Sequence, residues 1–137
     1  MQIIKVENDA SLQALTNQEF EAYEEPYKIS YHKEPFCFIA KEGEEIAGSI
    51  SGHSFYKEVH ISELIVFEKY RGNDIGSALI QWVEDYFKEK DIDHIHLCTY
   101  AFQAPAFYQK QGYTLEYIRK NRKDARLDKY HFVKYLD

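Results

Sequence analysis

The segment from residue 63 to residue 80, ELIVFEKYRGNDIGSALI, constrains the fold of this chain more than any other. An apolar strand pattern leads into the loop at 71–76, and the loop opens directly into an amphipathic helix. Small residues and free amides at the start of a helix form a site that an anion can approach closely. Arg71 adds a permanent positive charge that can contact phosphate through two donors. The pattern therefore predicts a polyphosphate site at this loop.

The bulk properties of the chain favour one domain over residues 1–137. At 137 residues and 45% hydrophobic content, the chain can bury a core of its own. The net charge of −6 argues against a nucleic-acid partner, because general binders of nucleic acid need many cationic contacts to phosphate. The N-terminal sequence lacks a basic region followed by a long apolar run, and no apolar stretch approaches membrane-spanning length. We therefore expect a cytoplasmic protein that does not bind a membrane.

Apolar periodicity and turn residues divide the chain into strands and helices. Strands are predicted at 2–6, 36–41, 46–55, 60–67, 94–100, 113–119 and 129–135, and helices at about 9–23, 75–89 and 105–111. This order describes an α/β fold of the α+β type, with a mixed sheet covered by helices. It lacks the repeated strand–helix alternation of a Rossmann domain.

Two of the predicted helices have an apolar face that indicates how they pack. The helix after the loop has one continuous apolar face, formed by Ile75, Ala78, Leu79, Trp82, Val83, Tyr86 and Phe87. Its polar side is expected to hold Gln81, Glu84, Asp85, Lys88 and Glu89. The helix near the N-terminus has a narrower stripe of Leu12, Leu15 and Phe20, with Asn8 or Asp9 as its cap.

Two longer signatures lie on either side of the central helix. The first is LIV at 64–66 followed by RGNDIG at 71–76, and except at residue 74 it follows the pattern L-x-V then [Q/R]-x-x-G-x-[G/A]. The second is Thr99 followed by APAFYQKQGY at 104–113, and it matches A-x-x-F-Y-x-K-x-G-[F/Y]. In type, order and separation these signatures resemble the GNAT superfamily of acyl-CoA-dependent N-acyltransferases. The resemblance covers essentially the whole chain.

The resemblance implies a GNAT-like fold of about seven strands and about four helices, in which the strands at 60–67 and 94–100 splay apart into a cleft. Acetyl-CoA would bind there as cosubstrate, with pantetheine along the first of these strands and the pyrophosphate on the amides of residues 71–77. A backbone N–H near Ile65 or Val66 would polarise the thioester carbonyl, and Phe102 would shape the channel. The cofactor-binding residues that the resemblance implies are Leu64, Ile65, Val66, Arg71, Gly72, Asn73, Asp74, Ile75, Gly76, Ser77, Thr99, Ala104, Phe107, Tyr108 and Lys110.

Asp74 departs from the family pattern, which has a glycine at this position. Aspartate tolerates a positive φ better than most residues, so the turn can still form. Its carboxylate could cap the helix and compete with phosphate for the same N–H groups, or repel the phosphate. Screening by solvent limits that repulsion to roughly 1 kcal/mol, or about a fivefold change in affinity. We therefore expect cofactor binding to be weakened but retained.

Tyr108 and Glu63 are the expected catalytic residues. In the family, the tyrosine that matches Tyr108 points its hydroxyl at the CoA sulfur, and a phenol is a proton donor at neutral pH. Several family members carry a glutamate at the position of Glu63 that takes the amine proton, usually through water. His60 and water itself are the alternative bases, and an unperturbed histidine titrates near neutrality. His60 should lie on the opposite face of its strand from Glu63 unless a bulge intervenes.

The resulting hypothesis is an enzyme that moves an acetyl group directly from acetyl-CoA to a primary amine of a small molecule or peptide. The alternative is a non-catalytic acyl-CoA-binding or regulatory domain of the same fold. His94, His96 and Cys98 share one face of a strand and could hold zinc, but such residues commonly pack, and we expect no metal. The identity of the acceptor stays open, as does a homodimer, which is frequent among the resembling proteins.

Overall fold

A computed structural model describes residues 1–30 and 33–137 of the chain. Its strands form one mixed six-stranded sheet in the order β1-β2-β3-β4-β6-β5, in which only the β3–β4 pair is parallel. The strands are β1 (Glu34–Glu42), β2 (Glu45–Phe55), β3 (Glu58–Val66), β4 (His94–Tyr100), β5 (Thr114–Arg119) and β6 (Lys129–Tyr135). The α-helices are α1 (Ala10–Glu24), α2 (Ile75–Lys88) and α3 (Pro105–Lys110). The mixed α/β class is confirmed, with one strand and one helix fewer than expected among the described residues.

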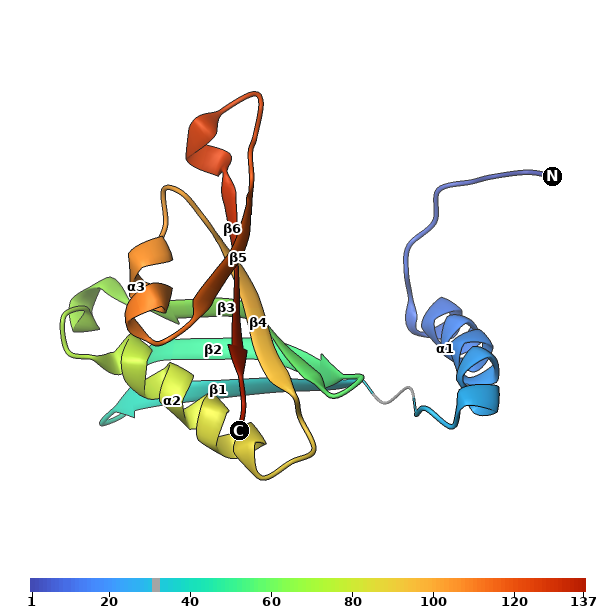
Figure 1. Ribbon diagram of the computed structural model, residues 1–137, viewed down its shortest axis with the longest axis horizontal. Helices are drawn as coiled ribbons and strands as arrows, with labels where there is room; N and C mark the ends of the chain where they lie inside the picture. The colour runs from blue at the N-terminus through green and yellow to red at the C-terminus, as the bar shows by residue number, and fades with distance from the viewer. Residues whose placement is uncertain (31–32) are drawn as a thin grey trace.

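The predicted first strand is the main error of the sequence analysis. Residues 2–6 are exposed, pair with no strand of the described chain and have no regular structure. The following helix does form, and Asp9 caps it by accepting a hydrogen bond from the N–H of Leu12 at 2.9 Å. Its apolar stripe is not buried, however, since Leu15 is 62% exposed. Figure 1 shows the reason: α1 and the N-terminal segment lie well away from the sheet.

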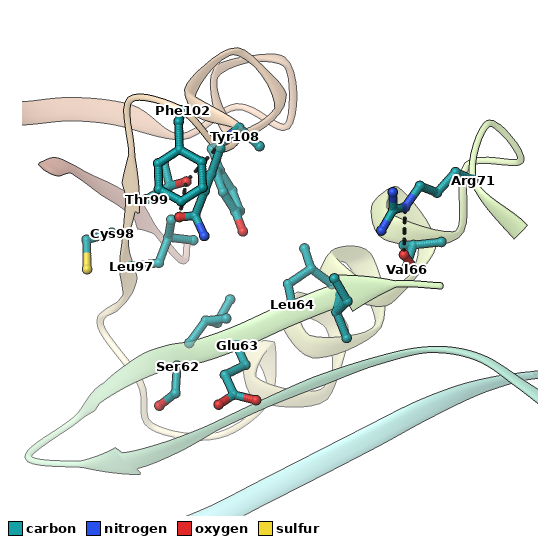
Figure 2. A pocket seen from close by; sticks show the side chains of 14 residues that line it. Ser62, Glu63, Leu64, Val66, Arg71, Leu97, Cys98, Thr99, Phe102 and Tyr108 are labelled. Carbon is teal, nitrogen blue, oxygen red and sulfur yellow. Dashed lines mark hydrogen bonds between the residues drawn. The ribbon is translucent and has the colours of Figure 1, made fainter. Parts of the chain in front are cut away.

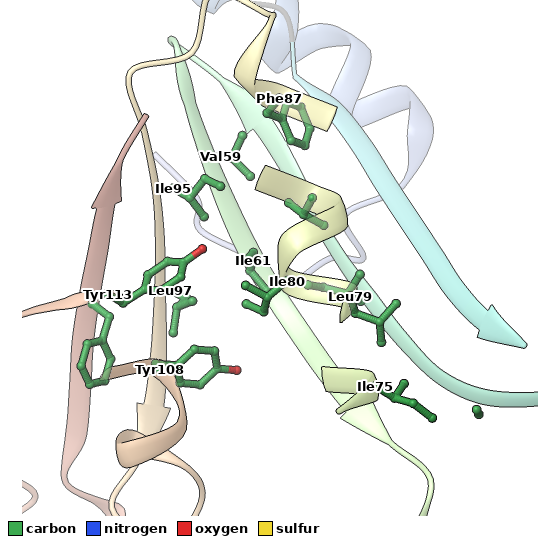
Figure 3. Close-up of a cluster of buried hydrophobic side chains, with 14 residues drawn as sticks. Val59, Ile61, Ile75, Leu79, Ile80, Phe87, Ile95, Leu97, Tyr108 and Tyr113 are labelled. Carbon is green, nitrogen blue, oxygen red and sulfur yellow. The ribbon is translucent and has the colours of Figure 1, made fainter. Parts of the chain in front are cut away.

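The core lies between α2 and one face of the sheet (Figure 3). The side chains of α2 that are buried there include Leu79, Ile80, Val83 and Phe87, and they pack with strand residues such as Val59 and Ile95. Burial of a large aliphatic or aromatic side chain contributes about 1.5–3 kcal/mol to stability. This face of α2 therefore attaches the helix firmly to the sheet, and with it the loop at its N-terminus.

The predicted apolar face of α2 is too wide on one side. Trp82 is 60% exposed and Tyr86 is 46% exposed, and their rings make edge contacts with the ring of Phe38 on β1. On the other side Glu84, expected to be solvated, is buried. Its carboxylate accepts hydrogen bonds from Lys134 Nζ at 2.6 Å and from the Tyr113 hydroxyl at 3.3 Å. These partners on β6 and after α3 explain why an acid is tolerated there.

A β-bulge in β3 turns part of this strand over. Ser51 pairs with Glu63 but the next residue, Gly52, pairs with Ile61, so Ser62 is the extra residue. A Cβ atom at Gly52 would overlap the carbonyl oxygen of His60, so only glycine fits opposite the bulge. Val59 and Ile61 before the bulge are buried in the core.

Beyond the bulge, the core contacts are made by Leu64 and Val66 instead. Because the bulge shifts the alternation by one residue, Glu63 and His60 lie on the same face of β3, away from the core. The bulge is the exception that the sequence analysis allowed, and so the two residues do not lie on opposite faces.

Candidate functional site

The parallel strands β3 and β4 separate after a short paired stretch, as the sequence analysis expected. They pair only at Glu58 with His94, Val59 with Ile95 and His60 with His96. Beyond the last of these pairs the two strands diverge and border a cleft of about 880 Å³ (Figure 2). Backbone groups of β3 that a neighbouring strand would otherwise engage face this cleft, so an extended ligand can bond to them.

Many of the predicted site residues come together in this cleft. Those that line it are Glu63, Leu64, Ile65, Val66, Arg71, Thr99, Ala104 and Tyr108, together with Phe102. The sequence analysis missed Ile61, Ser62, Leu97, Cys98 and Gln103, which also line it. Leu97 and Cys98 directly precede Thr99 of the second signature. They could have been identified as cleft residues if the point where β3 and β4 separate had been known from the sequence. Residues 72–77, Phe107 and Lys110 do not line the cleft.

The loop before α2 presents free amides near the mouth of the cleft. Asp74 adopts the left-handed conformation with φ of 59°, as its tolerance of positive φ predicted, and it makes no side-chain cap to the helix. The first N–H groups of an α-helix have no partner within the helix, and they carry a partial positive charge. The Asn73 side chain stabilises the loop by donating to the carbonyl oxygen of Tyr70 at 3.0 Å. The amides of the first turn of α2 are therefore not capped by Asp74 and suit an anion.

Arg71 links this loop to the cleft. Its Nε donates a hydrogen bond to the carbonyl oxygen of Val66 at 3.0 Å, which holds the side chain against the end of β3 (Figure 2). This bond uses one of the five N–H donors of the guanidinium. Arg71 lines the cleft, and its remaining N–H donors can pair with a phosphate.

Several residues of the two signatures, or next to them, contact each other. The Gln111 side chain donates to Ser77 Oγ at 2.9 Å, and the ring of Phe107 lies against Gly76. On the β4 side, Thr99 Oγ1 accepts a bond from the N–H of Ala104 at 3.3 Å. These contacts fix the start of α3 beside the end of β4 and beside the first turn of α2.

Tyr108 reaches the cleft from α3 and is only 8% exposed. Burial, followed by the nearby Cys98 thiol, raises the pKa of Tyr108 to about 12. The phenol is therefore protonated throughout the physiological range and can act as a hydrogen-bond or proton donor to a group in the cleft.

The two candidate bases occupy different places on the same face. Glu63 is exposed and lines the cleft. His60 lies at the last paired position, where its Nδ1 is 3.3 Å from Nδ1 of His96, and only one of these nitrogens can carry a proton in such a contact. Burial, and then the charges of His96 and His53, lower the pKa of His60 to about 4. His60 is therefore neutral at physiological pH and does not titrate near neutrality, contrary to the expectation from its type.

His94, His96 and Cys98 share the face of β4 that points away from the core, as their alternation predicted. The His94 ring contacts Asp93 at 2.8 Å and Glu58 at 3.2 Å. No three histidine, cysteine or acidic side chains within residues 1–30 and 33–137 are arranged to hold a metal ion.

The same geometry occurs in a known family. The family model of the GNAT acetyltransferases matches residues 3–113. The chain belongs to the GNAT acetyltransferase family. Its acetyltransferase domain includes both signatures, since the match begins before α1 and ends at Tyr113.

Individual relatives agree with this assignment to the GNAT family. A blasticidin-S acetyltransferase of Streptomyces morookaense is 37% identical over 79 residues, which are 57% of this chain and 58% of that protein. The match therefore spans less than two thirds of the length of that relative. A crystal structure of an acetyltransferase from Bacillus cereus is 25% identical with a TM-score of 0.80, covering 98% of each chain.

One further solved GNAT fold was crystallised with a ligand. An acetyltransferase from Bacillus anthracis in complex with acetyl coenzyme A has a TM-score of 0.67 and 22% identity, over 75% of this chain and 63% of that one. At this level of identity the likeness concerns the fold alone.

Among the residues described here, no helix has the length and apolar character needed to span a bilayer.

Proposed function

We propose that this GNAT protein transfers an acetyl group from acetyl-CoA to a primary amine of a small molecule or peptide. The observation that carries the proposal is the cleft between β3 and β4, which has free amides at its mouth and a buried phenol inside. Membership in the family supports the reaction type, and the name of the Streptomyces relative supports a small-molecule acceptor.

We expect one orientation of the cosubstrate, in which each of its parts meets a group of suitable chemistry. The pyrophosphate would meet the first-turn amides of α2 and the guanidinium of Arg71, which together supply positive charge and N–H donors. The pantetheine arm would lie along Leu64 and Val66, whose strand has no neighbour on the cleft side beyond His60. The thioester would then lie beside Tyr108. Lys110 is exposed on α3 and does not line the cleft.

Tyr108 would protonate the leaving thiolate. As the amine nitrogen forms its bond to the acetyl carbon, the carbon–sulfur bond breaks and the sulfur takes up the electron pair. The protonated phenol can supply a proton to that sulfur, and a backbone N–H of Ile65 or Val66 can stabilise the negative charge that develops on the carbonyl oxygen.

Glu63 would accept the proton that the amine loses, directly or through a water. It lines the cleft, whereas His60 lies where the strands are still paired and is not among the lining residues. A base must reach the proton it removes, so this geometry favours Glu63 over His60.

The alternative is a domain that binds acyl-CoA without catalysis. The acidic side chain of Asp74 beside the amide site is the feature that favours it, because a carboxylate weakens the affinity for a phosphate. The two functions differ in turnover and not in binding.

A thiol-release assay with acetyl-CoA and a broad panel of amines tests the proposal. Release of CoA that depends on an amine, with the acetylated amine identified by mass, is the expected result. Saturating acetyl-CoA should also raise the free energy of unfolding, by about 2.7 kcal/mol at a hundredfold excess over its Kd. Stabilisation without turnover for any amine would favour the binding domain. The absence of both stabilisation and turnover would refute both functions.

A further inference from the structure

The N-terminal arm, residues 1–29, leaves a large apolar surface uncovered by its own chain. Ile3 is 85% exposed, Leu15 is 62% exposed and Tyr23 is 75% exposed. In Figure 1 the arm continues outward from the start of β1 and does not return to the sheet. An isolated helix of this length is marginal in water, because most helix stability comes from packing an amphipathic face. The arm therefore needs a surface to pack on.

The accessible surface of the whole chain shows how much area the unpacked arm leaves exposed. The chain exposes 10416 Å². A compact monomer of 137 residues exposes about 7,500 Å² by the usual scaling of surface with mass. The excess of roughly 3,000 Å² per chain would amount to roughly 6,000 Å² for two chains, which lies at the upper end of the total area that obligate dimers bury. A chain in this conformation is thus missing an interface of dimer size.

The sheet has two surfaces on which the arm could pack. The first is the outer edge of β1, which is the end strand of the sheet, so that its backbone groups on that side face no other strand of the described residues. The second is the bare face, the surface of β1, β2 and β3 opposite α2. In register across it lie Ile39, Ser49 and Ile65, of which Ile39 is 49% exposed and Ile65 is 46% exposed. The small serine between two exposed isoleucines leaves room for a helix.

We infer that the arm of one copy docks on the β1 edge and the bare face of a second copy, in a reciprocal exchange. The run at residues 2–6 has the composition of a strand and would pair with the outer edge of β1. The stripe with Leu15 and Tyr23 would cover the row of Ile39, Ser49 and Ile65. When two copies exchange an identical element, each element makes with the other copy the contacts that it could make with its own chain, so no additional binding surface is needed.

A second copy fits the observed path of the chain better than the same copy does. In Figure 1 the arm lies beyond the start of β1 and away from the bare face of its own sheet. The bare face carries Glu63 as well, so the arm of the partner would border the acceptor side of the cleft.

The inference does not rest on the proposed function and is tested without an activity assay. Light scattering on the full chain should give twice the 16.3 kDa of one chain, and a monomer would overturn the exchange. Leu15→Asp combined with Tyr23→Asp should shift the mass to the monomer while the circular dichroism of the sheet is kept. Asn17→Asp, on the opposite side of α1, is the matched control and should leave the dimer intact. A dimer that survives the double substitution would refute docking through this stripe.

Crosslinking separates exchange from an arm that folds back. Ile4→Cys is combined with Cys98→Ser, so that the exposed Cys37 of β1 is the only other thiol. A short bis-maleimide should then give a covalent dimer on a denaturing gel, and Cys37→Ser should abolish it. Crosslinking within one chain, seen as a monomer band of altered mobility, would show that the arm docks on its own sheet. Absence of any crosslink would refute docking at this edge.

Discussion

The ring of Phe107 lies 3.3 Å from the position that a Cβ atom at Gly76 would occupy. Gly76 is in the first turn of α2 and Phe107 is in α3, so the two signatures recognised in the sequence touch each other in the fold. The absence of a side chain at Gly76 leaves room for this ring to pass over the backbone of the turn. The ring holds this turn next to the helix that carries Tyr108.

Substitution of Gly76 should therefore weaken both packing and cosubstrate binding in a graded way. Gly76→Ala asks the ring to move by a few tenths of an ångström, whereas Gly76→Val adds bulk that the contact cannot take, at a cost of about 1–3 kcal/mol. Urea denaturation should rank the variants as wild type, Ala and then Val, with the Kd for acetyl-CoA rising in the same order. A valine variant as stable as wild type would show that α3 is not held by this contact.

Tyr108→Phe should reduce kcat by about a hundredfold, the scale of a lost general acid, with little change in the KM for acetyl-CoA. Tyr113→Phe is the matched control, because its ring packs 6.2 Å from that of Tyr108 but its hydroxyl bonds to Glu84 outside the cleft. The control should lose about 1 kcal/mol of stability and keep its turnover. Equal turnover in wild type and Tyr108→Phe would exclude the phenol as the proton donor.

Removal of the charge at residue 74 should tighten acetyl-CoA binding. Asp74→Asn keeps the side-chain shape and tolerates the left-handed φ of 59°. Without the carboxylate, the affinity should rise by up to about fivefold at low ionic strength, and the gain should shrink as salt is added. Calorimetric titration at two salt concentrations measures it. An affinity that does not change at either concentration would mean that the phosphates bind away from this residue.

The depressed pKa of His60 makes the stability of the protein depend on pH. The pKa falls from 6.5 in the unfolded chain to about 4 in the fold, so between these values the unfolded state binds more protons. Stability contributed by neutral His60 is fully present above pH 6.5 and is lost as the pH falls towards 4. Its neighbours act in both directions, since His53 on β2 and His96 on β4 lower this pKa and Glu58 raises it.

Thermal melts between pH 7 and pH 4 should therefore show a decline in Tm that is shallower in His60→Gln. Comparison of the two proteins at each pH cancels the general effect of protonating carboxylates. Parallel declines would show that His60 is not the titrating group.

Local sequence patterns predicted most of the sheet because they record which face of a strand is buried. The bounds of β4 and β6 agree with the prediction, and β1, β2 and β3 agree within a few residues. The failure at residues 2–6 has a different origin. A strand is completed by hydrogen bonds to a neighbour, and nothing in a five-residue pattern says whether that neighbour is within reach. The burial of Glu84 was missed similarly, because Lys134 and Tyr113 are distant in the sequence.

The candidate site was predictable where it follows directly from the signatures. Arg71 and Tyr108 line the cleft as expected, and so do residues 63–66 of β3. Gly76, Ser77 and Phe107 instead hold the two signatures together, and Gln103 lines the cleft although no pattern singled it out. A motif tells which residues occur together, but it does not tell which of them face the ligand and which face each other.

The bulge in β3 has a consequence for how the acid in the cleft is placed. The orientation of Glu63 is determined on another strand, at Gly52, where the carbonyl of His60 occupies the space of a side chain. A methyl group there would clash with that carbonyl, so the two strands could not keep this register, and the placement of Glu63 in the cleft would be disturbed. On the proposed mechanism, a substitution that adds no charge, removes no donor and lies outside the cleft would thus impair proton removal.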